Sequence, residues 1–406
     1  MSPQHDLMSL PNNDTTPELD IADRFSELST ENSNNNNESA TTNTIENGTY
    51  RGIEKTPSPC VEFEQALAGS PQSGILVDTR TPKEYNEAHV YNAVNVPLMS
   101  NYERHIIGLT YHKESKDAAI RKGWELFSPI IQQFLEGFEM YREQKVIYVY
   151  CWRGGMRSRI VTNLLRMNGY NAIQVTGGFK RYMNDIVWKS LNETFPANYP
   201  PKFIVLFGNS GNGKTIILKE LQKRGMPVID LEGLAGHKGS LYGGVDTTPQ
   251  SQKMFSIHLY HELEQLKDSP YIFVEGEANK IGNVFLPDFV YTKIMGDLKV
   301  DITASIETRV KYTRAQYCTT GVALENLHEA TACHVMVRNI GNEKVSMLRK
   351  MLDDEDFDGF VEWLLLNYYD LRYRHSKADY SYEATVSSDD LEACCTELMD
   401  LYHSLT

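Results

Sequence analysis

The sequence contains no long apolar run, no paired cysteine motif and no leader-like start, and each absence excludes a class of protein. It has no stretch of about 18 apolar residues, so we expect no membrane-spanning helix. The first 30 residues are acidic and have neither the apolar core of a secretory signal nor the arginines of a transit peptide. The six cysteines include no Cys-x-x-Cys pair, which argues against a disulfide framework and a zinc site. We therefore expect a cytoplasmic protein, with a nuclear share left open. The oligomeric state is not readable from these features.

Charge is distributed unevenly along the chain of 406 residues, whose formal net charge is −14. Residues 1–50 contain nine acidic residues and one basic residue, and residues 351–406 contain fourteen and three. The stretch between them, 51–350, has 36 basic and 31 acidic residues, so the acidity of the whole chain does not exclude a nucleic-acid partner. Because residues 1–50 are also rich in asparagine and poor in apolar residues, we expect a disordered tail there.

Short apolar runs alternate with helical patterns after this tail, which predicts parallel α/β sheets. The length is sufficient for two domains. Clustered Asn and Pro residues predict a linker over 189–200. We therefore expect a first α/β domain over 51–188, a second over 201–315 and a helical C-terminal region over 316–406.

The centre of the first domain is a cysteine on a loop rich in glycine and arginine. The run 145–150 is expected to be a buried strand, and Cys151 follows it directly. Glycines in the loop let successive backbone N–H groups point inward, and the N-terminus of the following helix adds positive potential. Three arginines, Arg153, Arg157 and Arg159, add further positive charge. This field predicts a reactive thiol with a lowered pKa beside an anion site, rather than an inert buried cysteine.

An acid ends the strand expected over 74–78, and an arginine follows two positions later. Asp78 and Arg80 are two positions apart, so at a strand end their side chains point to the same side. Buried paired charges more often hold a structure than react. We expect this pair to brace the loop around Cys151 rather than to act in catalysis.

The second domain begins with a strand expected over 202–207, which runs into Gly-Asn-Ser-Gly-Asn-Gly-Lys-Thr at 208–215. This is a complete match to the phosphate-binding P-loop pattern, with a helix after it. Backbone N–H groups of such a loop surround a di- or triphosphate, the lysine neutralises its oxygens, and the threonine is a ligand for Mg²⁺ if a metal is used. The phosphate-binding residues that we predict are Gly208, Gly211, Gly213, Lys214 and Thr215.

Further polar residues follow the next strands of this domain. Asp230 and Glu232 are candidates to reach Mg²⁺ directly or through water, and the alternative is a solvated loop with a helix cap. His237 lies on the glycine-rich loop that comes next, and we expect it to contribute to substrate or phosphate binding. Glu275 directly follows the apolar run 271–274 and resembles the Walker B acid of P-loop proteins.

An aromatic and basic cluster lies at 364–374 and includes Tyr368, Tyr369 and Arg372. It predicts either ordinary helix packing or the stacking of RNA bases on its rings.

Several motifs of the first domain together resemble a rhodanese domain, a fold whose cysteine carries sulfur as a persulfide. Rhodanese loops commonly place an arginine five residues after the cysteine, whereas Arg157 is six residues after Cys151. This Cys-x5-Arg spacing is that of cysteine phosphatases, and the longer loop suits a larger tetrahedral anion. The matching segments are Asp78-x-Arg80, Glu84-Tyr85, His89, the cysteine loop and Gly177-Gly178.

The whole combination resembles the tRNA 2-selenouridine synthases, over about residues 52–375. The resemblance implies a substrate, the wobble 2-thiouridine of certain tRNAs, and no tightly bound cofactor. In that family selenium from selenophosphate replaces sulfur, through an S-geranyl intermediate made from geranyl diphosphate. The segments that carry the resemblance are Cys-Trp-Arg-Gly-Gly-Met-Arg-Ser at 151–158, Asp-Leu-Glu-Gly-Leu-Ala at 230–235 with His237 and Gly239, residues 275–287, and Tyr368-Tyr369-Asp370.

The resemblance suggests a division of labour between the two domains. We assign the diphosphate leaving group to Lys214 and Thr215, where positive charge stabilises the departing oxygens. We assign selenophosphate to the three arginines of the cysteine loop, with Cys151 as nucleophile or selenium carrier.

Two other functions stay open from the residues alone. One is a P-loop kinase or NTPase with a rhodanese-like sulfur-carrier or regulatory domain. The other is a cysteine phosphatase, suggested by the Cys-x5-Arg spacing. The phosphatase has little support elsewhere, because Tyr150 rather than a histidine precedes Cys151 and a phosphatase needs no P-loop.

Overall fold

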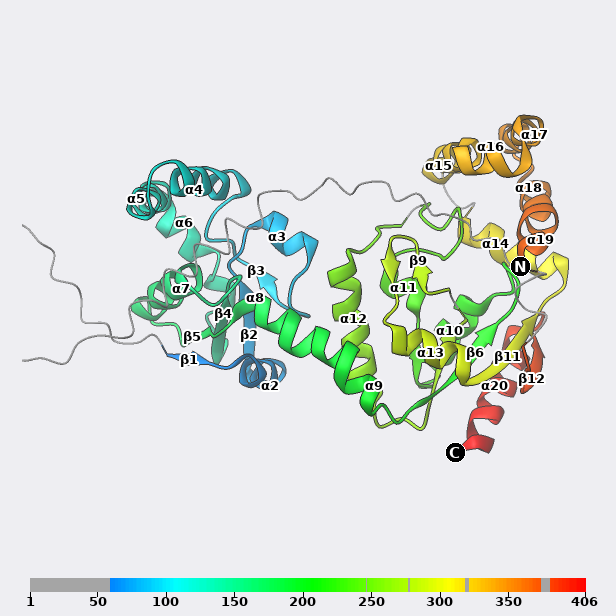
Figure 1. Cartoon of the computed structure of the whole chain (residues 1–406), viewed down its shortest axis with the longest axis horizontal. Coiled ribbons are helices and arrows are strands. Elements are labelled where there is room, and N and C mark those ends of the chain that lie inside the picture. Colours follow the sequence, from blue (N-terminus) through cyan, green and yellow to red (C-terminus); the bar gives the residue numbers. More distant parts are fainter. Residues whose placement is uncertain (1–58, 246, 277, 318–320, 374–379) are drawn as a thin grey trace, which may run out of the picture. The chain divides into compact units, whose positions relative to one another are not determined.

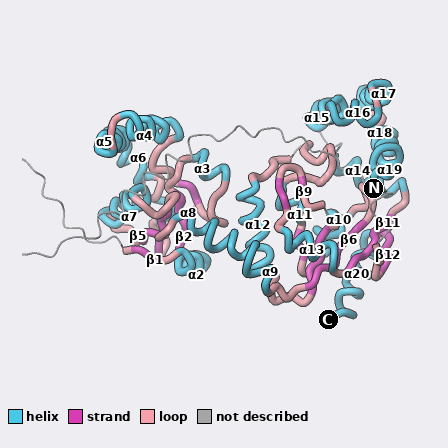
Figure 2. The backbone as a smooth tube through the Cα atoms, in the orientation of Figure 1, coloured by secondary structure: helices cyan, strands magenta, loops and turns pink. Residues whose placement is uncertain are grey.

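The computed structural model describes residues 59–406 except 246, 277, 318–320 and 374–379. The disordered tail predicted over 1–50 lies outside the described residues. The chain divides between Asn184 and Asp185 into two compact units. Each unit contains a sheet of five strands with helices around it (Figures 1 and 2). Among the described residues, no helix has both the length and the apolarity of a membrane span.

The first unit is built on a parallel sheet with the strand order β1-β5-β4-β2-β3. The central strand is the predicted run before Cys151, and its residues Ile147–Tyr150 are buried. Its β-branched and aromatic residues suit a strand covered on both faces. The strands are β1 (Cys60–Val61), β2 (Gly74–Asp78), β3 (Val94–Asn95), β4 (Val146–Tyr150) and β5 (Ala172–Val175).

Helices connect these parallel strands, and side-chain caps fix where several of them begin. Thr81 and Ser100 each form a capping box with a glutamate three residues later. Two helices between β3 and β4, α4 and α5, pack against each other and lie side by side in Figure 1. The helices are α2 (Phe63–Ser73), α3 (Pro82–Glu87), α4 (Asn101–Lys113), α5 (Lys116–Phe127), α6 (Ile131–Glu136), α7 (Met156–Met167) and α8 (Gly178–Arg181), with 3-10 turns at Ser128–Ile130 and Glu139–Tyr141.

The second unit has a parallel sheet with the order β12-β11-β6-β8-β7. Strand β6 is central, and later strands lie on both sides of it. In such sheets ligands bind beyond the carboxyl end of the strand where the order reverses, which is where the P-loop follows β6. The strands are β6 (Lys202–Phe207), β7 (Val228–Ile229), β8 (Tyr271–Glu275), β11 (Leu298–Thr303) and β12 (Ala384–Ser387), and β9 (Lys280–Ile281) and β10 (Val284–Phe285) form a separate antiparallel pair.

The helices of the second unit include a segment that was predicted as a linker. Residues 190–197 are helical, and Phe195 is buried against the rings of Tyr199 and Tyr260, which explains why this segment is structured. The α-helices are α9 (Phe195–Ala197), α10 (Lys214–Lys223), α11 (Leu231–Ala235), α12 (Gln252–Gln265), α13 (Asp288–Gly296), α14 (Ile306–Tyr317), α15 (Gly321–Ala332), α16 (His334–Ile340), α17 (Asn342–Asp353), α18 (Phe357–Leu364), α19 (Asp370–Tyr373) and α20 (Leu391–Leu405), with π-helical turns at Tyr182–Trp188, Ser190–Thr194 and Leu365–Tyr369.

The C-terminal region is helical, as predicted, but it also supplies a strand. Strand β12 pairs in parallel with β11 and so extends the P-loop sheet. Helix α20 then buries Cys394, Cys395 and Leu398 in the same core as Ile217 of the P-loop helix. The acidic residues of α20 lie on its exposed face. The acidic end of the chain is therefore a structural part of the phosphate-binding unit.

Candidate active sites

Cys151 lies at the carboxyl end of β4, directly before the loop that leads into α7. It is only 3% exposed, and its Sγ is 3.3 Å from Oγ of Ser158. Helix α7 begins at Met156, so its N-terminus is next to the sulfur, as the sequence predicts. The thiol therefore lies at the positive end of a helix dipole.

The cysteine loop is fixed by close backbone contacts with the turn that follows β5. Phe179 N–H donates to the Cys151 carbonyl at 2.9 Å, and Lys180 N–H donates to the Trp152 carbonyl at 2.8 Å. Gly178 has φ +59°, and a Cβ there would lie 2.3 Å from the Cys151 oxygen. Only glycine allows this approach, so the Gly177-Gly178 turn has a steric role in the site.

The predicted brace of Asp78 and Arg80 is present. Their side chains are buried and form an ion pair with a distance of 2.7 Å between Nη2 and Oδ2. The guanidinium of Arg80 lies 4.0 Å from the ring centre of Phe179, whose N–H holds the Cys151 carbonyl. Burial of the Arg80 guanidinium would lower its pKa. The neighbouring Asp78 carboxylate has the stronger effect and raises the pKa of Arg80, so the pair stays charged.

The three arginines of the loop have different environments. Arg157 forms a bidentate ion pair with Glu84 at 2.9 and 3.3 Å, so its charge is already partnered. Arg153 and Arg157 line the pocket beside Cys151, whereas Arg159 is exposed on α7 and does not line it. Anion binding by Arg159 stays a prediction, and its position one helical turn into α7 gives it less support than Arg153 and Arg157 have.

Glu84 connects this site to α4. Its carboxylate also lies 3.5 Å from Nε of Arg104. Burial alone would raise the pKa of Glu84, but Arg157 and Arg104 outweigh it and lower the pKa to about 2. Burial also favours a lower pKa for Arg157, and Glu84 and the Cys151 sulfur overcome this and raise it. The sequence motif contained Glu84, but nothing in it indicated this partnership.

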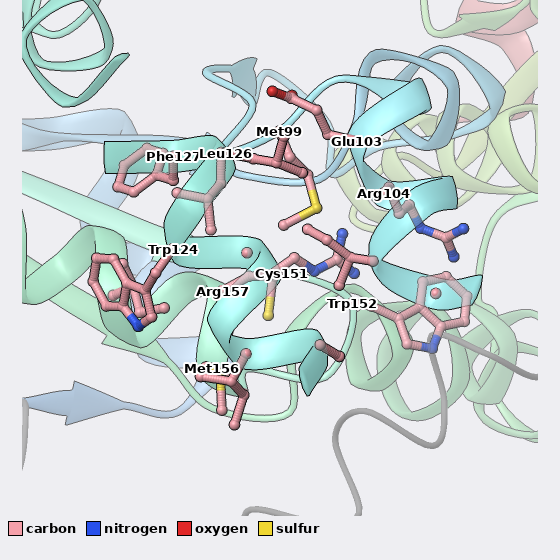
Figure 3. Close-up of a pocket in the computed structure, with 18 of the residues that line it drawn as sticks. Met99, Glu103, Arg104, Trp124, Leu126, Phe127, Cys151, Trp152, Met156 and Arg157 are labelled. Carbon is pink, nitrogen blue, oxygen red and sulfur yellow. The ribbon is translucent and has the colours of Figure 1, made fainter. Parts of the chain in front are cut away.

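An apolar pocket opens beside the Cys151 sulfur (Figure 3). Its cavity volume is about 130 Å³. Helices α4, α5 and α7 supply most of its wall, and in Figure 3 Trp124 and Trp152 lie on opposite sides of the sulfur. The residues that line it include Met99, Ile107, Gly123, Trp124, Phe127, Trp152, Met156 and Ile160.

The predicted P-loop of the second unit is positioned between β6 and α10. Gly208, Gly211 and Gly213 all have positive φ, as the curled loop requires. A Cβ at Gly213 would lie 2.8 Å from the ring of Tyr312, so this ring packs directly on the loop. Nζ of Lys214 donates to the carbonyls of Gly208 and Asn209, which holds the ammonium over the loop.

A chain of hydrogen bonds joins three predicted residues beside this loop. The Thr215 hydroxyl donates to Glu232 Oε2 at 3.0 Å, and Glu232 N–H donates to Glu275 Oε1 at 2.7 Å. In the described ranges no group of three or more His, Cys, Asp and Glu side chains is placed to hold a metal ion. Threonine and carboxylate oxygens are nevertheless the donors that Mg²⁺ prefers when substrate phosphates complete its shell.

Two other predicted residues lie elsewhere. The Asp230 carboxylate accepts from Gly233 N–H and caps α11, so the helix cap of the alternative is present, and the Mg²⁺ role of Asp230 stays a prediction. His237 does not line the P-loop pocket but is enclosed by Gly243 and Gly282, where any Cβ would meet its ring. Burial lowers the pKa of His237. Its ring packs within the loop that carries Lys238, and its phosphate-binding role stays a prediction.

In the aromatic cluster at 364–374, Tyr368 and Tyr369 pack in the core of the helical region. Tyr368 is 4% exposed, and Arg372 lies 4.3 Å from the centre of its ring. Tyr369 belongs to the same core and lines the P-loop pocket. Arg374 lies outside the described residues. The RNA-stacking alternative therefore finds no exposed ring at Tyr368.

The P-loop pocket combines a polar floor with an apolar wall. Lys214, Thr215, Glu232 and Glu275 line one part of it, and Lys238 lies nearby over the ring of Tyr317. The wall comes from the C-terminal helices and was not predicted, because its residues are more than 100 positions from the loop. That wall includes Leu327, Phe360, Val361, Leu364, Leu365 and Tyr369, and Tyr242, from the segment after α11, also lines the pocket.

Comparison with known proteins agrees with this architecture. Residues 61–185 match the family model of the rhodanese-like domain, and residues 201–401 match that of the tRNA 2-selenouridine synthase AAA domain. The second match extends beyond residue 375, so the resemblance covers the acidic C-terminal end that we expected to fall outside it.

Curated relatives match most of the chain. The tRNA 2-selenouridine synthase of Sulfurovum sp. (strain NBC37-1) is 30% identical over 77% of this chain and 90% of its own. That of Nitrosomonas europaea is 32% identical over 58% of this chain and 61% of its own. A solved structure, a rhodanese-like domain protein from Staphylococcus aureus, is 20% identical over 30% of this chain and 88% of its own, with a TM-score of 0.20.

The fold and its two sites define a rhodanese-like cysteine domain joined to a P-loop domain with a helical C-terminal region. The chain belongs to the tRNA 2-selenouridine synthase family of enzymes.

Proposed function

We propose that the protein converts wobble 2-thiouridine in tRNA to 2-selenouridine, using geranyl diphosphate and selenophosphate as co-substrates. The tRNA substrate follows from the names of its relatives. The observation that carries the geranyl step is the shape of the P-loop pocket, in which a phosphate-binding floor adjoins an apolar wall. The floor suits any di- or triphosphate, and the aliphatic side chains Leu327, Leu364 and Leu365 of the wall suit an isoprenoid chain.

The first step is alkylation of the thiouridine sulfur at the P-loop. The sulfur forms a bond to C1 of the geranyl group, the C1–O bond breaks, and diphosphate leaves while the base loses its ring proton to water. Lys214 and the loop N–H groups stabilise the charge that develops on the departing oxygens. Leu364, Leu365 and Phe360 hold the chain away from water.

Two residues beside the P-loop are suited to hold Mg²⁺ for this step. The Thr215 hydroxyl and the Glu232 carboxylate, which are 3.0 Å apart, would hold the ion. Glu275 orients Glu232 because its carboxylate accepts a hydrogen bond from the backbone N–H of Glu232. The ion would add positive charge against the diphosphate.

The second step takes place at Cys151, which acts as the nucleophile. Its sulfur adds to C2 of the geranylated base, the C2–S bond to the geranyl group breaks, and geranyl thiol leaves with the cysteine proton. Selenium of selenophosphate then attacks C2 and displaces Cys151, which regains a proton. Water cleaves the P–Se bond to give phosphate and selenouridine.

We favour this role over that of a selenium carrier because of its electron balance. Selenophosphate carries selenium at the selenide level, so a cysteine S–Se bond would require a two-electron oxidant. Neither co-substrate is an oxidant, whereas substitution at C2 needs none.

The test is mass spectrometry of nucleosides from a 2-thiouridine tRNA incubated with the full chain and both co-substrates. We expect selenouridine from the wild type, geranylated thiouridine alone from Cys151→Ala, and unchanged tRNA from Lys214→Ala. Matched controls are Cys60→Ala, at an exposed cysteine, and Lys223→Ala, at an exposed lysine of α10.

The same experiment separates this function from an NTPase. Unchanged tRNA with every variant, together with ATP hydrolysis that tRNA stimulates, would overturn the proposal. Selenouridine production by Cys151→Ala would retain the overall reaction but remove the cysteine from it.

A further inference from the structure

We propose that the apolar pocket beside Cys151 is the binding site for the geranyl chain of the S-geranyl intermediate. This inference rests on the proposed function and adds a second isoprenoid site to the one at the P-loop. It concerns only the first unit, where the pocket and the cysteine are both built from residues 98–160.

The chemistry of the wall is the first argument. A sulfur or selenium transferred as a small anion is held by N–H groups and cations, and it needs no hydrocarbon surface. This pocket instead has Leu98, Ile107, Ala119 and Phe127 buried in its wall, at 1–8% exposure. Such a lining contributes favourable binding free energy only when an apolar group enters the pocket.

The position of the sulfur is the second argument. Cys151 Sγ lies at the pocket, between the two tryptophans of Figure 3. When Cys151 attacks C2 of the base, the geranyl sulfur is bonded to that same carbon. The chain must therefore begin within a few bonds of Cys151, and the pocket beside it is apolar where the chain would run.

The size of the pocket limits how much of the chain it encloses. A cavity volume of about 130 Å³ is close to that of apolar cavities of about 150 Å³ that hold a benzene-sized group. One isoprene unit fits inside, and the other lies along the mouth. Trp124 stands at this mouth with 46% of its surface exposed, which suits a ring that covers part of a bound chain.

The occupant follows from comparing three ligands. A bare thiouridine base could stack on Trp124 or Trp152, but it would leave the enclosed part of the pocket at Ile107 and Ala119 unfilled. A protein partner would use the exposed Trp124 but would not reach the buried Ile107 and Ala119. An isoprenoid chain uses both the enclosed part and the mouth.

Binding is measured by tryptophan fluorescence of the full chain, since Trp124 and Trp152 line the pocket. The probe is the nucleoside S-geranyl-2-thiouridine, compared with S-dimethylallyl-2-thiouridine and 2-thiouridine. Each buried methylene tightens binding by about fourfold. We expect the geranyl probe to bind at least about tenfold more tightly than the dimethylallyl probe, and 2-thiouridine to give no saturable signal.

The variant Gly123→Leu fills the pocket without disturbing the backbone. A Cβ at Gly123 meets only Cδ1 of Ile107, at 3.7 Å, so the extra side chain enters the cavity. The control Arg121→Leu adds the same side chain on the exposed face of α5. We expect Gly123→Leu to weaken binding of the geranyl probe by at least about tenfold and Arg121→Leu to leave its affinity unchanged. A second variant, Trp124→Ala, removes part of the mouth from an exposed position.

The tRNA assay distinguishes failure of this inference from failure of the proposed function. With Gly123→Leu we expect geranylated tRNA to accumulate and selenouridine to fall, while Arg121→Leu behaves as the wild type. Equal binding of all three probes, or full selenation by both Gly123→Leu and Trp124→Ala, would overturn the pocket assignment. If the wild type itself leaves tRNA unchanged, the proposed function fails instead.

Discussion

Arg309 and Asp370 form a bidentate ion pair, with distances of 2.9 and 2.7 Å, although they are 61 positions apart in the sequence. The same guanidinium donates two hydrogen bonds to the Ser210 carbonyl in the P-loop. The Tyr-Tyr-Asp motif thus reaches the phosphate site through an arginine on α14. Asp370 fixes the Arg309 side chain by an ion pair, and Arg309 in turn fixes the P-loop through the Ser210 carbonyl.

This relationship predicts a large effect of Asp370→Ala. Removing one partner of a buried pair leaves the other charge uncompensated, so the free energy of unfolding of the second unit should fall by about 3–5 kcal/mol. Urea unfolding measures it. The matched control is Asp358→Ala, which breaks the ion pair of Asp358 with Arg314. Arg314 lies on α14, the helix that also carries Arg309. Because both partners there are more than half exposed, we expect a loss of at most about 1 kcal/mol.

The geranyl step should respond to the same substitution. In the Asp370→Ala variant, Arg309 no longer holds the P-loop. The rate of tRNA geranylation should therefore fall more than the affinity for tRNA. Equal stability losses for Asp370→Ala and Asp358→Ala would contradict the bracing role.

The low pKa of Glu84 predicts a specific dependence of stability on pH. The pKa of Glu84 is about 2 in the folded protein and 4.5 in its reference state, so the carboxylate stabilises the fold above about 4.5. This contribution is lost as the pH falls from about 4.5 through about 2 and is on the order of 3 kcal/mol. Unfolding measured at about pH 6 and about pH 3 should show a smaller difference for Glu84→Gln than for the wild type.

The control for this measurement is Glu125→Gln, at a glutamate whose side chain is 67% exposed in its pair with Lys122. It should keep the wild-type dependence on pH. If Glu84→Gln and the wild type lose the same stability on acidification, the ion pair with Arg157 does not control the acid response.

The close approach at Gly178 predicts that alanine is not tolerated there. The added Cβ would lie 2.3 Å from the Cys151 oxygen and 2.5 Å from the Gly154 nitrogen. Both atoms belong to the backbone, so neither can move without shifting the cysteine loop. We expect the free energy of unfolding to fall by about 2–4 kcal/mol and selenation to be lost.

Gly169→Ala separates steric clash from backbone strain. Gly169 also has positive φ, +84°, but an added Cβ meets nothing within 4 Å. This variant should cost about 1 kcal/mol and keep selenation. A similar loss in both variants would mean that conformation alone, rather than contact with the cysteine loop, requires glycine at Gly178.

Local sequence signals predicted the framework of both sites. Strands β2 and β6 begin and end where the apolar runs do, because β-branched runs bounded by loop residues are unambiguous. The P-loop and the cysteine loop were readable because their glycines and charges are contiguous. The Asp78–Arg80 pair was readable because two positions on one strand end must face the same side.

Features that depend on distant segments were not predicted. The partnership of Arg157 with Glu84 joins positions 73 apart, and no local pattern specifies it. The wall of the Cys151 pocket arises where α4 and α5 pack together, and their apolar residues alone indicate only that each helix has a buried face. Strand β12 is four residues long and has little sequence signal, so its pairing with β11 emerges only in the assembled sheet.

The contact between Ser388 and Asn212 has a consequence for how the chain is made. The Ser388 hydroxyl donates to the Asn212 carbonyl inside the P-loop at 2.8 Å, across 176 positions of sequence. During synthesis the P-loop emerges long before the strand and helix that complete its core, whereas the rhodanese-like unit is already whole. We expect the two halves of the enzyme to mature in sequence, with the cysteine site formed early and the phosphate site formed only after β12 and α20 leave the ribosome. A stalled or nicked chain would then contain the folded Cys151 loop and lack a completed P-loop site.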